Sequence, residues 1–270
     1  MLREVILSEE STSSESVLSN LSTASRGNRT AWFVAIAVMF ITSLPYLYGL
    51  YLQGSRQELG FYSWFNYNTS DACVYFSWIR QAADGYFFQQ NLFTTEPQSN
   101  RLFNLFFLAL GTIAGITDSS PIAIYQLTRF IVGVCFLRAT WWLIGLLLED
   151  TDSRVNAFII ICFSAGFGWI PVLWSMGYQG PVDIWQPEAV SFVSIYLFPL
   201  FTFSLLLMVW IFGLLITAER TGKTKYAFGA GICGLLLGNI HTYDVITVMA
   251  VWSGYLIEIS LADLRVTSGS

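Results

Sequence analysis

The sequence predicts an all-α integral membrane protein: a bundle of about six transmembrane helices, with juxtamembrane helices in the first outer loop. Three observations predict it: 54% of the 270 residues are apolar, only 11% are charged, and several apolar runs approach the length of a span. A soluble domain has about 25% charged residues, and a helix needs about 20 apolar residues to cross a bilayer. The mean hydropathy of +0.57 agrees with this class.

Charge and motifs exclude several classes of function. The 13 basic residues are outnumbered by 18 acidic ones and form no basic stripe, which excludes nucleic-acid binding. The four cysteines have no CxxC spacing, so neither a disulfide framework nor a cysteine zinc site is expected. The sequence also lacks a P-loop, a GxGxxG after a strand, a GxSxG elbow and an HExxH helix, which argues against ATP-driven, hydride-transfer and soluble-type hydrolase chemistry.

The domain organisation follows from the apolar stretches. Residues 1–30 are polar and rich in Ser and Thr, so they predict a disordered cytoplasmic tail. Residues 263–270 predict a short cytoplasmic tail, which we expect to be truncated. Between them, residues 31–262 form the multispan domain, beginning with a retained span at 31–52 in which Pro45 is a candidate kink. The other apolar stretches are 102–116, 122–148, 155–173, 192–217, 226–240 and 244–261.

The stretch 102–116 is too short for an ordinary span, and the basic residues decide its placement. With the N-terminus in the cytoplasm, a crossing at 102–116 would put the basic connector 219–225 outside, together with Arg154 and Arg265. Without that crossing all of these are inside, as the positive-inside rule requires. We therefore expect six spans and one interfacial helix, with an outer loop at 53–121.

An amphipathic helix is predicted in that loop, beginning near Asp71. Asp71 opens a stretch with apolar residues at helical spacing, directly after Asn68, Thr69 and Ser70, which are residue types that cap helices. Asp71 is either part of the cap, complementing the helix dipole, or a carboxylate held at the lipid–water boundary. In the second case partial desolvation would raise its basicity for general-base work.

Two further outer segments gather polar and aromatic residues. Residues 183–188 contain Asp183, Trp185 and Glu188 around a proline, which suits either a rigid ligand-binding turn or an ordinary interfacial loop. The connector between the last two spans holds the only histidine, His241, with Tyr243 and Asp244. An acid at the start of a span is costly unless it has a partner or faces a cavity.

Two arginines lie inside the span 122–148. Each charge would cost about 2.5–3.5 kcal/mol at the centre of a membrane helix, so each is expected to have a partner or to reach water. Arg129 is about two turns from the outer end, where its planar guanidinium could hold a phosphate. Arg138 is near mid-span, and we expect it to pair structurally or to face a polar crevice.

The order of these features resembles the GT-C superfamily of membrane glycosyltransferases. The resemblance rests on the first span, the early acid in Asp71-x-x-x-Tyr75 and several short motifs. These motifs are at 93–97 (Phe-Thr-Thr-Glu-Pro), 125–129 (Tyr-Gln-Leu-Thr-Arg), 166–169 (Gly-Phe-Gly-Trp), 183–188 and 241–244.

The resemblance implies transfer of a sugar from a polyprenyl-phosphate donor to an acceptor on the outer face, in the bacterial inner membrane. Asp71 would then be the catalytic base, and Arg129 and Arg101 would bind the donor phosphate. The expected substrate-binding residues are Asp183, Trp185, Glu188, His241, Tyr243 and Asp244. The partners would be the lipid-linked sugar donor and membrane lipids, with no nucleic acid.

The chain departs from the superfamily in three ways. Ala72 follows Asp71 where several relatives have a second acid, which leaves open whether a divalent metal ion takes part. Thr242 replaces an expected proline, and the chain resembles only the amino-terminal part of such an enzyme. The alternatives are therefore a non-catalytic multispan protein, either transporter-like or a scaffold, and an inactive truncated transferase fragment.

Overall fold

The computed structural model describes residues 2–56, 62–66, 68–99, 101–164, 166–168, 170 and 190–268, with side chains from residue 25 to residue 261. Regular structure in these ranges is helical, apart from one isolated bridge between Gln89 and Leu102. The all-α prediction is confirmed for this part of the chain. The helices are α1 (Leu2–Ser55), α2 (Thr69–Ala83), α3 (Leu105–Thr117), α4 (Pro121–Leu147), α5 (Thr151–Phe163), α8 (Ser191–Leu197), α9 (Pro199–Thr221), α10 (Thr224–Ile240) and α11 (Thr242–Ser268).

Four described segments are long and apolar enough to cross a membrane, so the chain is a membrane protein. They are Ser25–Ser55 within α1, Pro121–Leu147, Pro199–Thr221 and Thr242–Leu261 within α11. Helices α5 and α10 lie in the same bundle but have only 13 and 17 residues. The predicted span 155–173 continues past Phe163 into residues of which half lie outside the described ranges.

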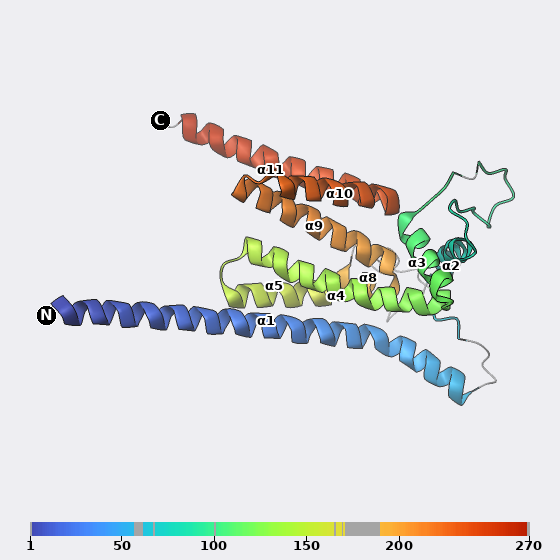
Figure 1. The fold of residues 1–270 in the computed structure, drawn as a ribbon, viewed down its shortest axis with the longest axis horizontal. Coiled ribbons are helices and arrows are strands. Elements are labelled where there is room, and N and C mark those ends of the chain that lie inside the picture. The colour runs from blue at the N-terminus through green and yellow to red at the C-terminus, as the bar shows by residue number, and fades with distance from the viewer. Residues whose placement is uncertain are drawn as a thin grey trace.

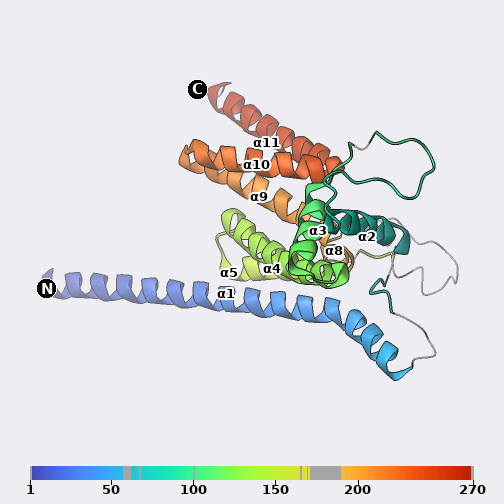
Figure 2. The ribbon, with the colours of Figure 1, turned by 45° about the vertical axis from the view of Figure 1, so that its right-hand side comes forward.

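The two ends of the bundle differ in what they contain. Both chain termini lie at one end, and α2, α3 and the loop between them lie at the other (Figure 1). Figure 2 shows the same division after rotation. The basic connector between α9 and α10 is at the end with the termini, which is the division that the distribution of Lys and Arg predicts.

Helix α3 does not run the length of the bundle. At its start, the Asn104 side chain donates to the Ile240 carbonyl at the end of α10 (3.1 Å), and the Leu105 amide donates to Asn239 (2.7 Å). At its other end only three residues separate Thr117 from α4, which starts at the same end of the bundle (Figure 1). Both ends of α3 are therefore on the loop side.

Helix α1 is longer than the apolar stretch at its centre. It begins at Leu2, so residues expected to form a disordered tail are helical in the structure. Residues 2–26 contain neither Pro nor Gly, and an established span extends by one hydrogen bond per added residue. Pro45 lies inside the helix, which bends in its C-terminal part (Figure 1), because proline removes a backbone donor and its ring crowds the preceding turn.

The stretch 192–217, predicted as one span, is two helices. Phe198 has extended backbone angles, and Pro199 begins α9 immediately after it. A residue before proline is disfavoured in the helical region, so the break at Phe198 is a local consequence of Pro199. The short helix α8 therefore ends at the loop side of the bundle, where it contributes backbone groups to the site described below.

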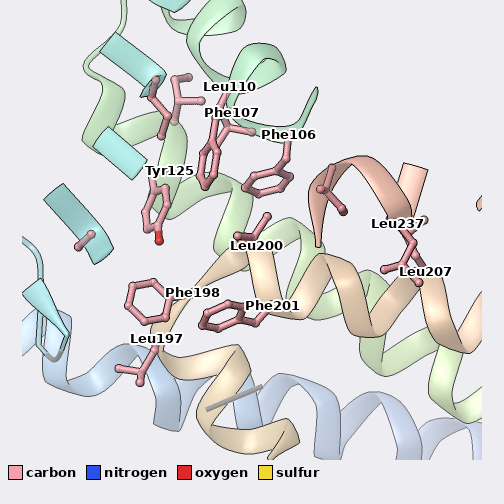
Figure 3. Packing of buried hydrophobic residues seen from close by; sticks show 14 of the residues in the cluster. Phe106, Phe107, Leu110, Tyr125, Leu197, Phe198, Leu200, Phe201, Leu207 and Leu237 are labelled. Carbon is pink, nitrogen blue, oxygen red and sulfur yellow. The ribbon is translucent and has the colours of Figure 1, made fainter. Parts of the chain in front are cut away.

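An aromatic core holds the loop helices against the bundle. Phe106 and Phe107 from α3, Tyr125 from α4, and Phe198 and Phe201 beside and within α9 converge in it (Figure 3). The ring of Tyr75 on α2 stacks on Phe107 at 4.8 Å and meets Phe198 edge-on at 5.7 Å. Rings packed in these geometries fix α2 and α3 to the end of the bundle.

Candidate functional site

The first polar cluster surrounds Arg129, whose side chain is only 4% exposed. Its Nε donates to Gln126 Oε1 (2.9 Å), its Nη2 to Ser43 Oγ (3.0 Å) and its Nη1 to the Ile195 carbonyl (3.4 Å). The guanidinium also lies over the Tyr46 ring, 4.5 Å from its centroid. Arg129 of α4 is thus held by contacts with α1 and α8 and by Gln126 of its own helix.

All of these partners are neutral. Within the described part of the chain no carboxylate makes an ion pair with Arg129. Hydrogen bonds and a cation–π contact lower the cost of burying the cation, but no described residue supplies a compensating negative charge. The cluster is therefore suited to an anion with several oxygen acceptors, and a phosphate matches the planar donor geometry of arginine.

A cavity of about 310 Å³ adjoins this cluster at the N-terminal end of α4. Gln126 belongs to its wall, and the same side chain connects Arg129 with the Trp64 carbonyl (3.4 Å). The other lining residues are Trp64, Ser120, Ile122 and Ala123. Gln126 is thus shared by the cavity wall and the Arg129 cluster.

The second polar cluster joins α9, α10 and α11. His241 follows the last residue of α10, and its Nδ1 lies 2.9 Å from Oδ2 of Asp244 in the first turn of α11. Ser204 of α9 donates a hydrogen bond to the same carboxylate oxygen. His241 is only 8% exposed, between the rings of Phe201 and Tyr243. The expectation that Asp244 needs a partner is confirmed, whereas the Tyr243 side chain is 75% exposed.

Sequence reasoning missed three polar residues beside this cluster. Gln89 is 1% exposed and accepts from the Asn104 amide at 3.0 Å. Asn104 and Asn239 then connect α3 to the end of α10. The Gln89 Nε2 is buried and has no hydrogen-bond partner among the described residues. Asn104 was detectable, because an asparagine directly before an apolar helical run is a capping signal.

Asp71 is half-buried in the first turn of α2. The cap of this helix is Asn68, whose side chain accepts from the Asp71 amide, while Asn68 Nδ2 donates to Asp71 Oδ2 at 2.6 Å. The capping role proposed for Asp71 therefore belongs to Asn68. The Asp71 carboxylate makes no ion pair with a described residue, which leaves it available for other work.

The structure separates the predicted site residues. Arg129 contacts α1 and α8, whereas His241 and Asp244 lie where α9, α10 and α11 meet. Arg101 is exposed. The carbonyl of its neighbour Leu102 accepts a hydrogen bond from the Gln89 amide, so Arg101 lies near the contact between α3 and the end of α10. Asp71, His241 and Asp244 line neither the cavity at Gln126 nor a second described cavity between α2 and α3, which Ala82 and Leu108 help to line. Asp183, Trp185 and Glu188 lie outside the described residues.

A metal site is not assembled by the described side chains. No group of three or more His, Cys, Asp or Glu residues among them is placed to hold an ion. The comparisons add no assignment: no protein-family model, no curated protein and no solved structure matches this chain.

Proposed function

We propose that this chain is the membrane module of a glycosyltransferase, which moves a sugar from a polyprenyl-phosphate donor to an acceptor on the outer face of a membrane. By its resemblance to the GT-C superfamily, that membrane is the bacterial inner membrane. The observation that supports the proposal most is the buried Arg129, surrounded by neutral partners in the outer part of α4. A lipid-linked phosphate supplies the missing negative charge from within the bilayer.

The proposed reaction divides the work between two residues. The Asp71 carboxylate takes the proton of the acceptor hydroxyl as the hydroxyl oxygen forms a bond to the anomeric carbon. The bond between that carbon and the phosphate oxygen breaks, and the electron pair leaves with the lipid phosphate. Arg129 stabilises the charge that develops on this leaving group.

Helix packing supports the pairing of these residues. The helix that carries Asp71 packs on α4 through Phe76 and Tyr125, whose ring centroids are 4.9 Å apart. Tyr125 is one helical turn from Arg129 on the same face of α4. The proposed base and the proposed phosphate ligand therefore belong to directly packed helices.

Replacement of Asp71 by Asn tests the proposed base. Asn keeps the size of the side chain but has no useful basicity, so sugar transfer should fall about 100-fold or more. The assay uses the purified chain in liposomes with radiolabelled polyprenyl-phosphate sugars and a panel of hydroxyl acceptors. Asp84→Asn is the matched control, because Asp84 follows the same helix, is exposed and forms an ion pair with Arg80 (3.1 Å) at the surface.

Full transfer activity in Asp71→Asn would remove the base assignment. Arg129→Lys provides a second arm, because lysine keeps the charge but cannot reproduce the planar arrangement of donors. Transfer should fall in this variant too, while Asp84→Asn retains it. An unchanged rate in Arg129→Lys would contradict the phosphate assignment independently of Asp71.

A non-catalytic membrane bundle is the second candidate, and one observation favours it. The described structure keeps the Arg129 cluster apart from the His241–Asp244 cluster, whereas a transferase needs donor and acceptor groups at one reacting centre. A lipid-binding scaffold needs only the Arg129 cluster. Binding of polyprenyl phosphate without transfer to any acceptor would favour this second function.

A further inference from the structure

A second cation without an ion-pair partner among the described residues lies in the same span as Arg129, toward the end of the bundle with the termini. The Arg138 guanidinium is over the ring of Trp32 on α1, 4.5 Å from its centroid. Its Nη1 is buried and has no hydrogen-bond partner among the described residues. No described carboxylate forms an ion pair with Arg138.

The depth of this pair follows from helix geometry. Gly27 marks the end of the bundle, because a Cβ added to it would lie 2.6 Å from the side chain of Thr151, the first residue of α5. Trp32 is five residues further along α1, which is about 8 Å at the rise of an α-helix. Along α4, Arg138 is nine residues from Leu147 at the same end, which is about 14 Å. Its guanidinium therefore lies between mid-span and the headgroups of one leaflet, and a long side chain can reach the headgroups from there by snorkelling.

The Arg138–Trp32 pair is accessible to lipid at the surface of the bundle. Trp32 is 41% exposed, and Arg138 is only half-buried. Arg29 is exposed and precedes Trp32 by three residues, so it is on the same face of α1, nearer to the headgroups. Two cations thus flank one tryptophan where a phospholipid headgroup would lie.

We propose that Arg138, Trp32 and Arg29 form a binding site for the phosphate of an anionic glycerophospholipid, in the leaflet next to the chain termini. Arg138 donates to the phosphate oxygens from the membrane side, Trp32 holds its guanidinium by the cation–π contact, and Arg29 interacts with the headgroup from the water side. This site is separate from the Arg129 cluster, nine residues earlier in α4, and it does not depend on the proposed transferase activity. The competing occupant is an acidic residue on a transmembrane helix of another protein.

Lipid binding is measured by native mass spectrometry of the purified full chain in detergent, titrated with phosphatidylglycerol or with phosphatidylcholine. We expect the chain to retain one phosphatidylglycerol several-fold more tightly than phosphatidylcholine. Arg138→Gln should weaken phosphatidylglycerol binding about tenfold, because the charge-assisted bonds to phosphate are lost. Arg29→Gln should weaken it a few-fold. Arg80→Gln, an exposed arginine in α2 at the opposite end of the bundle, is the matched control and should bind like the wild type.

Three results would overturn the proposal. The first is wild-type affinity for phosphatidylglycerol in Arg138→Gln, and the second is an equal loss of affinity in Arg80→Gln. The third is a protein partner that binds the wild type and is lost in Arg138→Gln, while lipid binding is unchanged. If Arg138→Gln does not fold, Trp32→Leu and Arg29→Gln decide, because both positions are at the lipid-exposed surface. At least a threefold loss in each is expected, and wild-type affinity in both would end the assignment.

Discussion

Single glycines determine how closely the loop helices approach each other. A Cβ added to Gly111 of α3 would lie 2.3 Å from the backbone carbonyl of Ile79 on α2, and one added to Gly115 would lie 2.6 Å from that of Ala83. Real Cβ atoms do not approach a carbonyl oxygen this closely, and backbone has little freedom to move away. The position of α2, and with it that of Asp71, therefore depends on the absence of side chains at two positions of α3.

Gly111→Ala should destabilise the protein by about 1–3 kcal/mol, because the new methyl group forces α2 and α3 apart. The matched control is Gly234→Ala in α10, where an added Cβ meets nothing within 4 Å. That change should be neutral or slightly stabilising, since alanine favours helix more than glycine does. Unfolding of both variants in detergent, followed by tryptophan fluorescence, measures the difference. Equal stability of the two variants would show that the α2–α3 contact is looser than the structure has it.

Helix ends explain how the elements are held at the end of the bundle that contains the termini. The Asp150 side chain caps α5, accepting from the Ser153 amide at 2.8 Å. Hydrogen bonds from the backbone and side chain of Ser153 lower the pKa of the Asp150 carboxyl. Arg220 at the end of α9 donates to the Leu146 carbonyl at the end of α4 (2.7 Å). Short polar contacts of this kind fix the connectors, while apolar packing fixes the helices between them.

The cap at Asp150 gives a pH-dependent prediction. A carboxyl group whose pKa is lowered by folding stabilises the native state above its ordinary pKa of about 4, and this contribution is lost as the pH falls through the lowered value. Asp150→Ala should lower the unfolding midpoint at pH 7, whereas Asp150→Asn should preserve it, because asparagine caps helices about as well as aspartate. Thermal unfolding between pH 7 and pH 3 measures this. The midpoint of the wild type should fall relative to that of Asp150→Asn as the pH decreases, and a constant difference would contradict the role of the charge.

At the scale of the whole molecule, the ends of the bundle define its orientation in the membrane. The termini and the connector at Gly222 lie at one end, and both ends of α3 lie at the other. Because Lys and Arg are concentrated at the end with the termini, that end should face the cytoplasm. The Arg129 cluster then lies nearer to the outer face, and the Arg138 pair lies in the inner leaflet.

Cysteine labelling tests this orientation. Single cysteines replace Thr94, Ser119 or Thr221 in a cysteine-free background, and an impermeant thiol reagent is added to intact cells. Thr94 and Ser119 precede and follow α3, so both should be labelled from outside, while Thr221 should react only after permeabilisation. Labelling of Thr94 and Ser119 from opposite sides would show that α3 crosses the membrane.

The sequence by itself determined the class of this protein and most of its elements. Apolar content and run length are properties of local sequence, so they sufficed to predict an all-α membrane protein with two helices in the outer loop. The proximity of His241 to Asp244 was also readable, because three residues separate them in the chain. Likewise, the break at Phe198 follows from Pro199 alone, although the apolar run concealed it.

Only the tertiary structure decided which distant groups meet. The Arg129 partners Ser43 and Ile195 are 86 and 66 residues away in sequence, and Ser204 is 40 residues from Asp244. Apolar helices of similar composition can pack in many orders, and no local pattern specifies the neighbours of a given face. Whether a buried arginine has a carboxylate, a carbonyl or a ring beside it depends on that packing. That Arg129 and Arg138 have no ion-pair partner among the described residues, on which both proposals rest, therefore became visible only once the helices were placed.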